Sequence, residues 1–231
     1  MNRANSIEQL GQLDIERVSR GESLLDGLRR RYDGHYPIDP FGLDAQLADA
    51  VQPFFKAAIR VHVVGVDAVP KQGPAVVVAN RGLGAVEPIA LGLAVLQATG
   101  RRLRNVGAPR VPFVGAAARR LGAIAGSEHD VLAALHAGHL VGVPLAPSGL
   151  RIHAGDAPAA LATALTHSPI VPAAVVPRGR LGALTGSWEV RFGSLVTLPD
   201  PYDPQDPLTA GRFADAMQDA VAALLVPPTN S

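Results

Sequence analysis

The sequence contains no cysteine, few aromatic residues and almost no lysine. Without cysteine the chain forms no disulfide, performs no thiol catalysis and offers no thiolate ligand to zinc. Aromatic residues make up 4% of the chain and hydrophobic residues 48%, so the core has to be built from Ala, Val, Leu and Ile. Of the 21 basic residues only Lys56 and Lys71 are lysines, a bias from which we draw no function.

Long apolar runs and a strong net charge are also missing. No uninterrupted apolar run approaches the roughly 18–20 residues of a membrane-spanning helix. The first residues, MNRANSIEQLGQLD, have no apolar centre of the kind that a signal peptide needs. The formal net charge of +1 argues against a general nucleic-acid binder. We therefore expect a cytoplasmic protein, with peripheral contact to the inner face of the membrane left open.

Composition divides the chain into three parts. Residues 1–40 carry many charges and have leucines at helical spacing over 24–28, so we expect a helical, charged N-terminal extension. Residues 41–226 have the length of one large α/β domain. Residues 227–231 are a short C-terminal tail.

Within residues 41–226, short apolar runs alternate with helical stretches. Strands are predicted at 60–66, 75–79, 103–107, 139–145, 170–176 and 188–192. Helices are predicted at 44–59, 87–98, 111–121, 128–137, 157–166 and 208–225, the first with Leu47, Val51, Phe54 and Phe55 on one side. Runs such as AVVVA are apolar throughout, as in parallel strands covered on both faces. The pattern predicts a three-layer α/β domain with a mixed, mostly parallel central sheet flanked by helices.

Four blocks of sequence carry a family resemblance. They read VVGVDAVPKQGPAVVVAN (63–80), VPFVGAAARRLGAIAG (111–126), LVGVPLAPSGLR (140–151) and SPIVPAAVVP (168–177). In this order they resemble the motifs of the glycerophospholipid acyltransferase family, the lysophosphatidic-acid-acyltransferase-like (PlsC-like) proteins. In the first block the matching positions are Gly65, Val69-Pro70, Gly73-Pro74 and Asn80. The resemblance runs from about residue 40 to about residue 225, and it implies the glycerol-phosphate acyltransferase-like fold.

The resemblance also implies a chemistry that this chain departs from. In the family, a histidine after the first-motif asparagine takes the proton of an acceptor hydroxyl while an acyl group leaves its thioester, and an aspartate orients that histidine. Here the histidine position holds Arg81, whose guanidinium is a cation without an acceptor atom, so it cannot be that base. The nearest acid is Glu87, with five residues between it and Arg81, where the family usually has four. We predict that Arg81 and Glu87 form an ion pair at the positions where the family has its catalytic histidine and aspartate. The alternative is that Glu87 simply begins the next helix, where an acid suits the helix dipole.

The third motif is altered as well. Aligned without a gap, the family's Phe-Pro-Glu-Gly falls on residues 144–147; with a slip of two, Pro147-Ser148-Gly149 replaces Pro-Glu-Gly. Neither alignment keeps the glutamate. A glycine loop with an arginine can still hold an anion, so substrate or anion binding is predicted for Asn80, Ser148, Gly149 and Arg151.

His153 is the one histidine close to a motif loop and is the candidate for a replacement base. His136 and His139 are expected to flank a turn. Neither H-E-x-x-H nor H-x-x-E-H spacing occurs, so no metal site is predicted. We expect no cofactor, with acyl-CoA as the substrate that the resemblance implies.

A basic segment begins after the first block and runs into the second. Between Gly100 and Gly122 there are six arginines and no acid, with apolar residues among them. Such a patch suits an anionic bilayer surface, and the candidate lipid or membrane contacts are Arg110, Phe113, Arg119 and Arg120. The simpler alternative is a surface helix whose arginines extend over core residues.

Three hypotheses follow. The first is a non-catalytic family member that binds a lipid, an acyl chain or a protein partner. The second is an active but atypical acyltransferase with a rearranged site. The third is a regulatory or scaffold protein that pairs with an intact homologous acyltransferase through residues 1–40.

Overall fold

A computed structural model describes residues 38–81, 86–107, 113–145, 167–179, 181–197 and 207–226. Several sequence predictions lie outside these ranges. They are the N-terminal helices, the helix at 157–166, and the site residues Arg110, Ser148, Gly149, Arg151 and His153.

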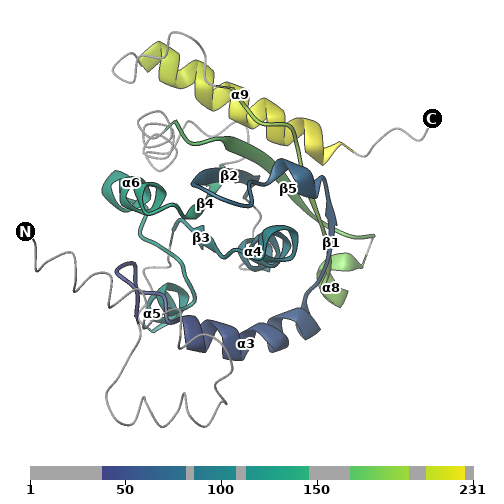
Figure 1. Ribbon diagram of the computed structural model, residues 1–231. Helices are drawn as coiled ribbons and strands as arrows, with labels where there is room; N and C mark the ends of the chain where they lie inside the picture. Colours follow the sequence, from purple (N-terminus) through teal and green to yellow (C-terminus); the bar gives the residue numbers. More distant parts are fainter. Residues whose placement is uncertain are drawn as a thin grey trace, which may run out of the picture.

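All six predicted strands are present, and they form one sheet (Figure 1). The strands are β1 (Arg60–Val64), β2 (Ala75–Asn80), β3 (Leu103–Asn105), β4 (Leu140–Leu145), β5 (Ile170–Pro177) and β6 (Ser187–Phe192), in the order β1-β6-β5-β2-β4-β3. The β5–β6 ladder is antiparallel and the other four ladders are parallel. The predicted mixed, mostly parallel sheet is therefore confirmed.

Helices cover both faces of this sheet, as the predicted three layers require. They are α3 (Ala45–Ala58), α4 (Val86–Thr99), α5 (Val114–Arg120), α6 (Glu128–His136), α8 (Gly182–Thr185) and α9 (Pro207–Leu225), with a short 3-10 turn η1 (Val66–Ala68). Two start at side-chain caps: Asp44 accepts a hydrogen bond from the Leu47 N–H at α3, and Ser127 accepts one from the Asp130 N–H at α6.

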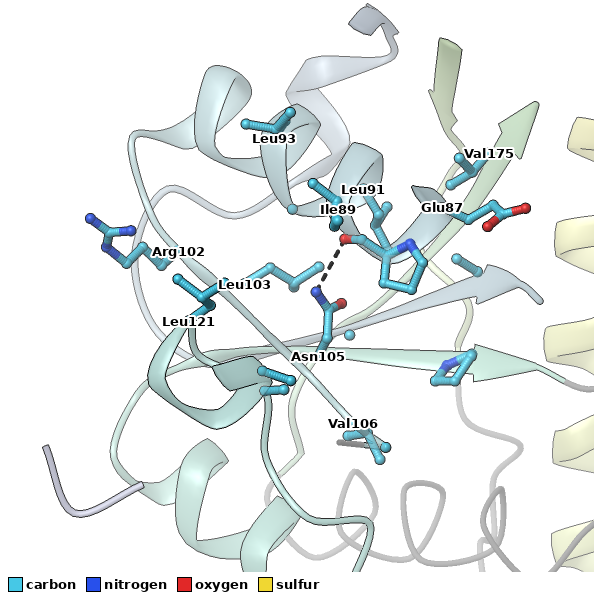
Figure 2. Close-up of a pocket in the computed structure, with 18 of the residues that line it drawn as sticks. Glu87, Ile89, Leu91, Leu93, Arg102, Leu103, Asn105, Val106, Leu121 and Val175 are labelled. Carbon is cyan, nitrogen blue, oxygen red and sulfur yellow. Dashed lines mark hydrogen bonds between the residues drawn. The ribbon is translucent and has the colours of Figure 1, made fainter. Parts of the chain in front are cut away.

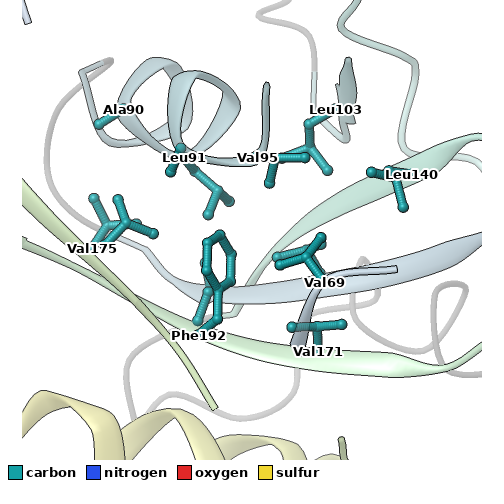
Figure 3. Packing of buried hydrophobic residues seen from close by; sticks show 14 of the residues in the cluster. Val69, Ala90, Leu91, Val95, Leu103, Leu140, Val171, Val175 and Phe192 are labelled. Atoms are coloured by element: carbon teal, nitrogen blue, oxygen red, sulfur yellow. The ribbon is translucent and has the colours of Figure 1, made fainter. Parts of the chain in front are cut away.

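The core consists of two aliphatic clusters, one on each face of the sheet. Strand side chains alternate between the faces, so Val77 of β2 packs with α4 whereas Val76 and Val78 pack with α6 and α9. Figure 3 shows the α4 side, where Leu91 and Val95 meet side chains of the sheet. Each fully buried Val or Leu contributes about 1.5–3 kcal/mol. The predicted Ala, Val, Leu and Ile core is confirmed, with Trp188, Phe192 and Phe213 as its buried aromatic members.

One helix-side prediction is wrong. Phe54 was expected on the inner side of α3 with Val51 and Phe55, but its side chain is 74% exposed. The reason is the helix period: Phe54 lies six residues after the buried Ala48, which at 100° per residue turns it about 120° away from the inner side. Val51 and Phe55 do face inward.

The edge strand β3 is covered by the turn at residues 38–44. Arg104 of β3 is buried and forms an ion pair with Asp39, and its guanidinium lies 5.7 Å from the Phe41 ring centroid. The second Asp39 oxygen accepts hydrogen bonds from the Phe41 and Leu43 N–H groups at 3.0 and 2.8 Å. The His139 ring lies edge-on to Phe41, with the centroids 5.3 Å apart. The backbone at the end of β3 is bonded by another segment, because the Ile124 N–H donates to the Asn105 carbonyl oxygen at 2.9 Å.

We predict that His139 makes the protein less stable in mild acid. Burial lowers the pKa of His139 below its ordinary 6.5; Arg104 and Arg101 also lower it and Asp39 opposes them. Because the unfolded chain then binds a proton more readily, the free energy of unfolding falls as pH drops below about 6.5. Unfolding by denaturant at pH 7 and pH 5 should show a smaller loss for His139→Gln than for the natural sequence. His62→Gln, at an exposed β1 position, is the matched control, and an equal effect of both substitutions would contradict the prediction.

Candidate functional site

A cavity of about 570 Å³ lies between the helices and the carboxyl ends of the central strands. Its walls come from α3, α4 and α5 and from the ends of β2, β3 and β4. In sheets with mainly parallel strands, ligands bind at the carboxyl ends of the strands. The volume falls in the range of about 300–1,000 Å³ that is usual for small-molecule sites.

The cavity lining is mostly apolar and has two distinct ends. Figure 2 shows Glu87 and Val175 at one end, and Arg102 with Leu121 at the other. Between them lie apolar side chains, among them Val51, Phe55, Ile89, Leu91 and Leu103. A long apolar wall with a polar group at one end suits an amphiphile with a single hydrocarbon chain.

Asn80 forms the wall of the polar end and holds two strands together. Its amide Nδ2 donates to the Val175 carbonyl oxygen at 3.0 Å, and its Oδ1 accepts from the Val175 N–H at 2.7 Å. The β2–β5 ladder ends one residue earlier, at Ala79 and Ala173. The Asn80 side chain thus continues the pairing of β5 after the two strands diverge. The geometry gives the Asn80 amide a structural role, and the binding of substrate or an anion by Asn80 stays a prediction.

Arg81 and Glu87 both line the cavity, yet they do not form the predicted ion pair. Among the ion pairs of the described residues none joins them. Arg81 is exposed, and its backbone N–H donates to the Leu145 carbonyl oxygen at 3.1 Å. Glu87 is in the first turn of α4, as the alternative interpretation held. Its Oε2 is buried and has no hydrogen-bond partner in the described part of the chain.

Sequence reasoning missed two residues of the cavity, Asn105 and Gly142. The Asn105 Nδ2 donates to the Pro88 carbonyl oxygen at 3.1 Å and so ties the end of β3 to the start of α4 (Figure 2). A Cβ on Gly142 would lie 2.6 Å from the Asn105 Oδ1 and 2.8 Å from a Leu103 methyl, so only glycine leaves room for these side chains. An isolated glycine inside the apolar run LVGVPL was the available signal, because such a glycine often marks a close approach.

At the other end of the cavity, an ion pair joins two of its walls. Arg102, just before β3, bonds through Nη2 to the Asp49 carboxylate of α3. Both side chains are partly exposed, so the pair contributes little to stability. Its position fixes the spacing between α3 and β3.

The predicted lipid-contact residues Phe113, Arg119 and Arg120 lie on or beside α5, which packs against α3 (Figure 1). Phe113 is 90% exposed and Val114 53% exposed, and Arg119 is also exposed. Phe113 has a φ of 66°, a rare backbone conformation for a bulky side chain. Arg120 differs from its neighbours, because it is partly buried and its Nη1 lies 3.9 Å from the Asp44 carboxylate.

Two features are absent from the described residues, a membrane-spanning helix and a cluster of metal ligands. None of the helices there is both long and apolar enough to cross a membrane. No group of three or more histidine, aspartate or glutamate side chains comes together there in a way that could hold a metal ion.

Comparison with known proteins gives relatives without an assigned activity. The chain is 34% identical over 170 residues to an uncharacterised protein of Mycobacterium tuberculosis, covering 64% of this chain and 48% of the relative. It is 37% identical over 127 residues to an uncharacterised protein of Mycobacterium leprae, covering 50% and 35%. The chain thus spans less than half the length of these curated relatives.

No family model matches the chain. Among solved structures, it is similar to the 1-acyl-sn-glycerophosphate (LPA) acyltransferase PlsC from Thermotoga maritima. The identity is 18% and the TM-score 0.48, and the match covers 79% of this chain and 80% of that chain. We therefore argue the function from the residues of the cavity.

We predict that Asn80→Ala destabilises the fold by about 1–3 kcal/mol, because it leaves the Val175 N–H and carbonyl without partners. Asn105→Ala is the matched control, since it removes one exposed bond to Pro88 and should cost less. Denaturant unfolding of the two variants measures the difference. Equal losses would show that Asn80 does not hold β5.

Proposed function

We propose that this chain binds a single-chain lipid in its apolar cavity and does not itself catalyse acyl transfer. The observation that carries the proposal is the cavity at the carboxyl ends of β2 and β4, which is apolar along its length and has Arg81 at its polar end. An amphiphile can place its chain among Leu91, Leu103 and Phe55 and its head near Arg81. Burial of the chain would drive binding at about 25 cal/mol per Å² of apolar surface.

The positions shared with the acyltransferase family support the non-catalytic part of this proposal. Gly65 has a φ of 75°, and a Cβ there would lie 2.2 Å from the Phe192 carbonyl oxygen. Val69 is 2% exposed, and Asn80 holds β5. These matching residues build the fold. The position that supplies the base in the family holds Arg81, which has no acceptor for a proton.

The exposed surface of α5 suggests how a lipid would reach the cavity. Val114 and Leu121 line the cavity and are also exposed at 53% and 36%, so the apolar lining continues onto the surface. Phe113 and Arg119 lie beside them. An apolar ring with a neighbouring cation suits the interface of a membrane that contains anionic lipid. Contact with the inner face of the membrane and pairing with a homologous acyltransferase stay predictions.

The first test is native mass spectrometry of the purified protein, followed by extraction of bound lipid. We expect a bound lipid with a single hydrocarbon chain, such as a lysophospholipid or a monoacylglycerol. Gly142→Ala, whose methyl group would press on Asn105 and Leu103, should lower the affinity for an added lipid about tenfold, the effect of about 1.4 kcal/mol. Gly211→Ala in α9 is the control, because open space surrounds that position. A lipid-free natural protein that gains no mass with added lipids would overturn the proposal.

A second test addresses catalysis. We expect no acyl transfer from acyl-CoA to lysophosphatidic acid above the background rate, and no change in Arg81→Ala, because the guanidinium cannot accept the hydroxyl proton. A thioester assay with mass detection of the product measures both. Transfer that Arg81→Ala abolishes would establish the rival hypothesis of an active but atypical enzyme.

We also predict that Phe113→Ser weakens binding to vesicles of phosphatidylcholine and phosphatidylglycerol by about tenfold or more, since it removes a large apolar side chain from the interface. Co-sedimentation measures the bound fraction. Leu184→Ser is the matched control: Leu184 is 85% exposed but lies on α8, far from α5 (Figure 1). Equal binding of both variants would place the contact elsewhere.

A further inference from the structure

The Glu87 carboxylate is the unusual group of the cavity. Its Oε2 is buried and has no hydrogen-bond partner in the described residues. Two other buried side-chain polar atoms share this condition there, Arg104 Nη1 and Trp188 Nε1, but neither residue lines the cavity. A buried acceptor without a donor is costly, and a carboxylate more so than a neutral group.

Among the described residues, none of the neighbouring polar side chains of the cavity bonds to Glu87 Oε2. The Asn80 amide is used by Val175, and the Asn105 amide by the Pro88 carbonyl oxygen. The side chain of Arg81 is exposed and forms no ion pair with Glu87. At the far end, Arg102 is paired with Asp49. A hydroxyl group of a molecule in the cavity can supply the missing donor.

We propose that Glu87 Oε2 accepts a hydrogen bond from a hydroxyl group of the bound lipid. The inference rests on the proposed function and adds a selectivity to it. The favoured ligand has one hydrocarbon chain and a neutral head with a free hydroxyl, as in a monoacylglycerol. A free fatty acid would place its carboxylate beside that of Glu87, and two like charges in a low-dielectric site repel strongly.

The positions in Figure 2 agree with this orientation. Glu87 and Val175 lie at one end of the lining, and Ile89, Leu91 and Leu103 extend from there toward Leu121. A chain lying along these residues leaves its head group next to Glu87. Arg81, at the exposed rim, can contact an anionic group that lies farther out than the hydroxyl. Glu87 is thus a binding residue, and no proton transfer is assigned to it.

The test compares ligands of equal chain length by displacement of Nile red, a fluorescent probe without charge. The natural protein should bind monolaurin at least about tenfold more tightly than laurate or methyl laurate, the second of which has no hydroxyl donor. Glu87→Gln should raise the affinity for laurate until the protein binds monolaurin and laurate about equally. The reason is that the glutamine amide carries no charge and can donate a hydrogen bond to the laurate carboxylate. Glu128→Gln, also in the first turn of a helix but exposed, should leave the ratio of the two affinities unchanged.

Each outcome decides between the two proposals. Equal affinity of the natural protein for monolaurin and methyl laurate would overturn the role of Glu87 while the lipid-binding function stands. The role of Glu87 would also be overturned if Glu87→Gln changed the affinity for every ligand by the same factor. If none of the ligands displaces the probe or binds, the proposed function itself fails. The comparison of ligands on the natural protein needs no substitution, so it stays decisive even if Glu87→Gln does not fold.

Discussion

The interaction on which the site depends is the pair of hydrogen bonds between the Asn80 side chain and the Val175 backbone. Strand β5 leaves β2 at this point to continue alongside β6 in the antiparallel direction. An amide can replace a strand neighbour because it offers one donor and one acceptor, as a peptide group does. The clamp fixes the end of β2, and with it the start of the Arg81 loop and one end of the cavity.

Near Asn80, the residues that build the framework differ from the residue at the position where the resembled family has its base. Gly65 and Val69, which match the acyltransferase pattern, are held by backbone conformation and by burial. Arg81 departs from the pattern, and it is exposed at the cavity rim. The framework can therefore keep a cavity of this size with an arginine in place of a histidine at position 81. Fold and function are separable for this reason.

The cavity also explains two features that are costly on their own. Gly142 weakens the interior of a central strand, because glycine has no side chain to pack there. It is needed because Asn105 and Leu103 occupy the space of its missing Cβ. Glu87 leaves an acceptor buried without a partner, which a ligand with a hydroxyl would satisfy.

The sequence by itself determined the strands, most helices and the burial of both faces of the sheet. These features depend on residues close together in the sequence, such as the apolar run AVVVA and the helix caps Asp44 and Ser127. It also identified Arg81 as unable to serve as a base, since that follows from the guanidinium alone. Only the tertiary structure decided that Asn80 bonds to Val175, 95 residues away, and that Arg81 and Glu87 remain apart. It alone brought Phe55, Leu103 and Gly142 into one cavity and turned Phe54 outward. These outcomes depend on how distant elements pack, which no local pattern encodes.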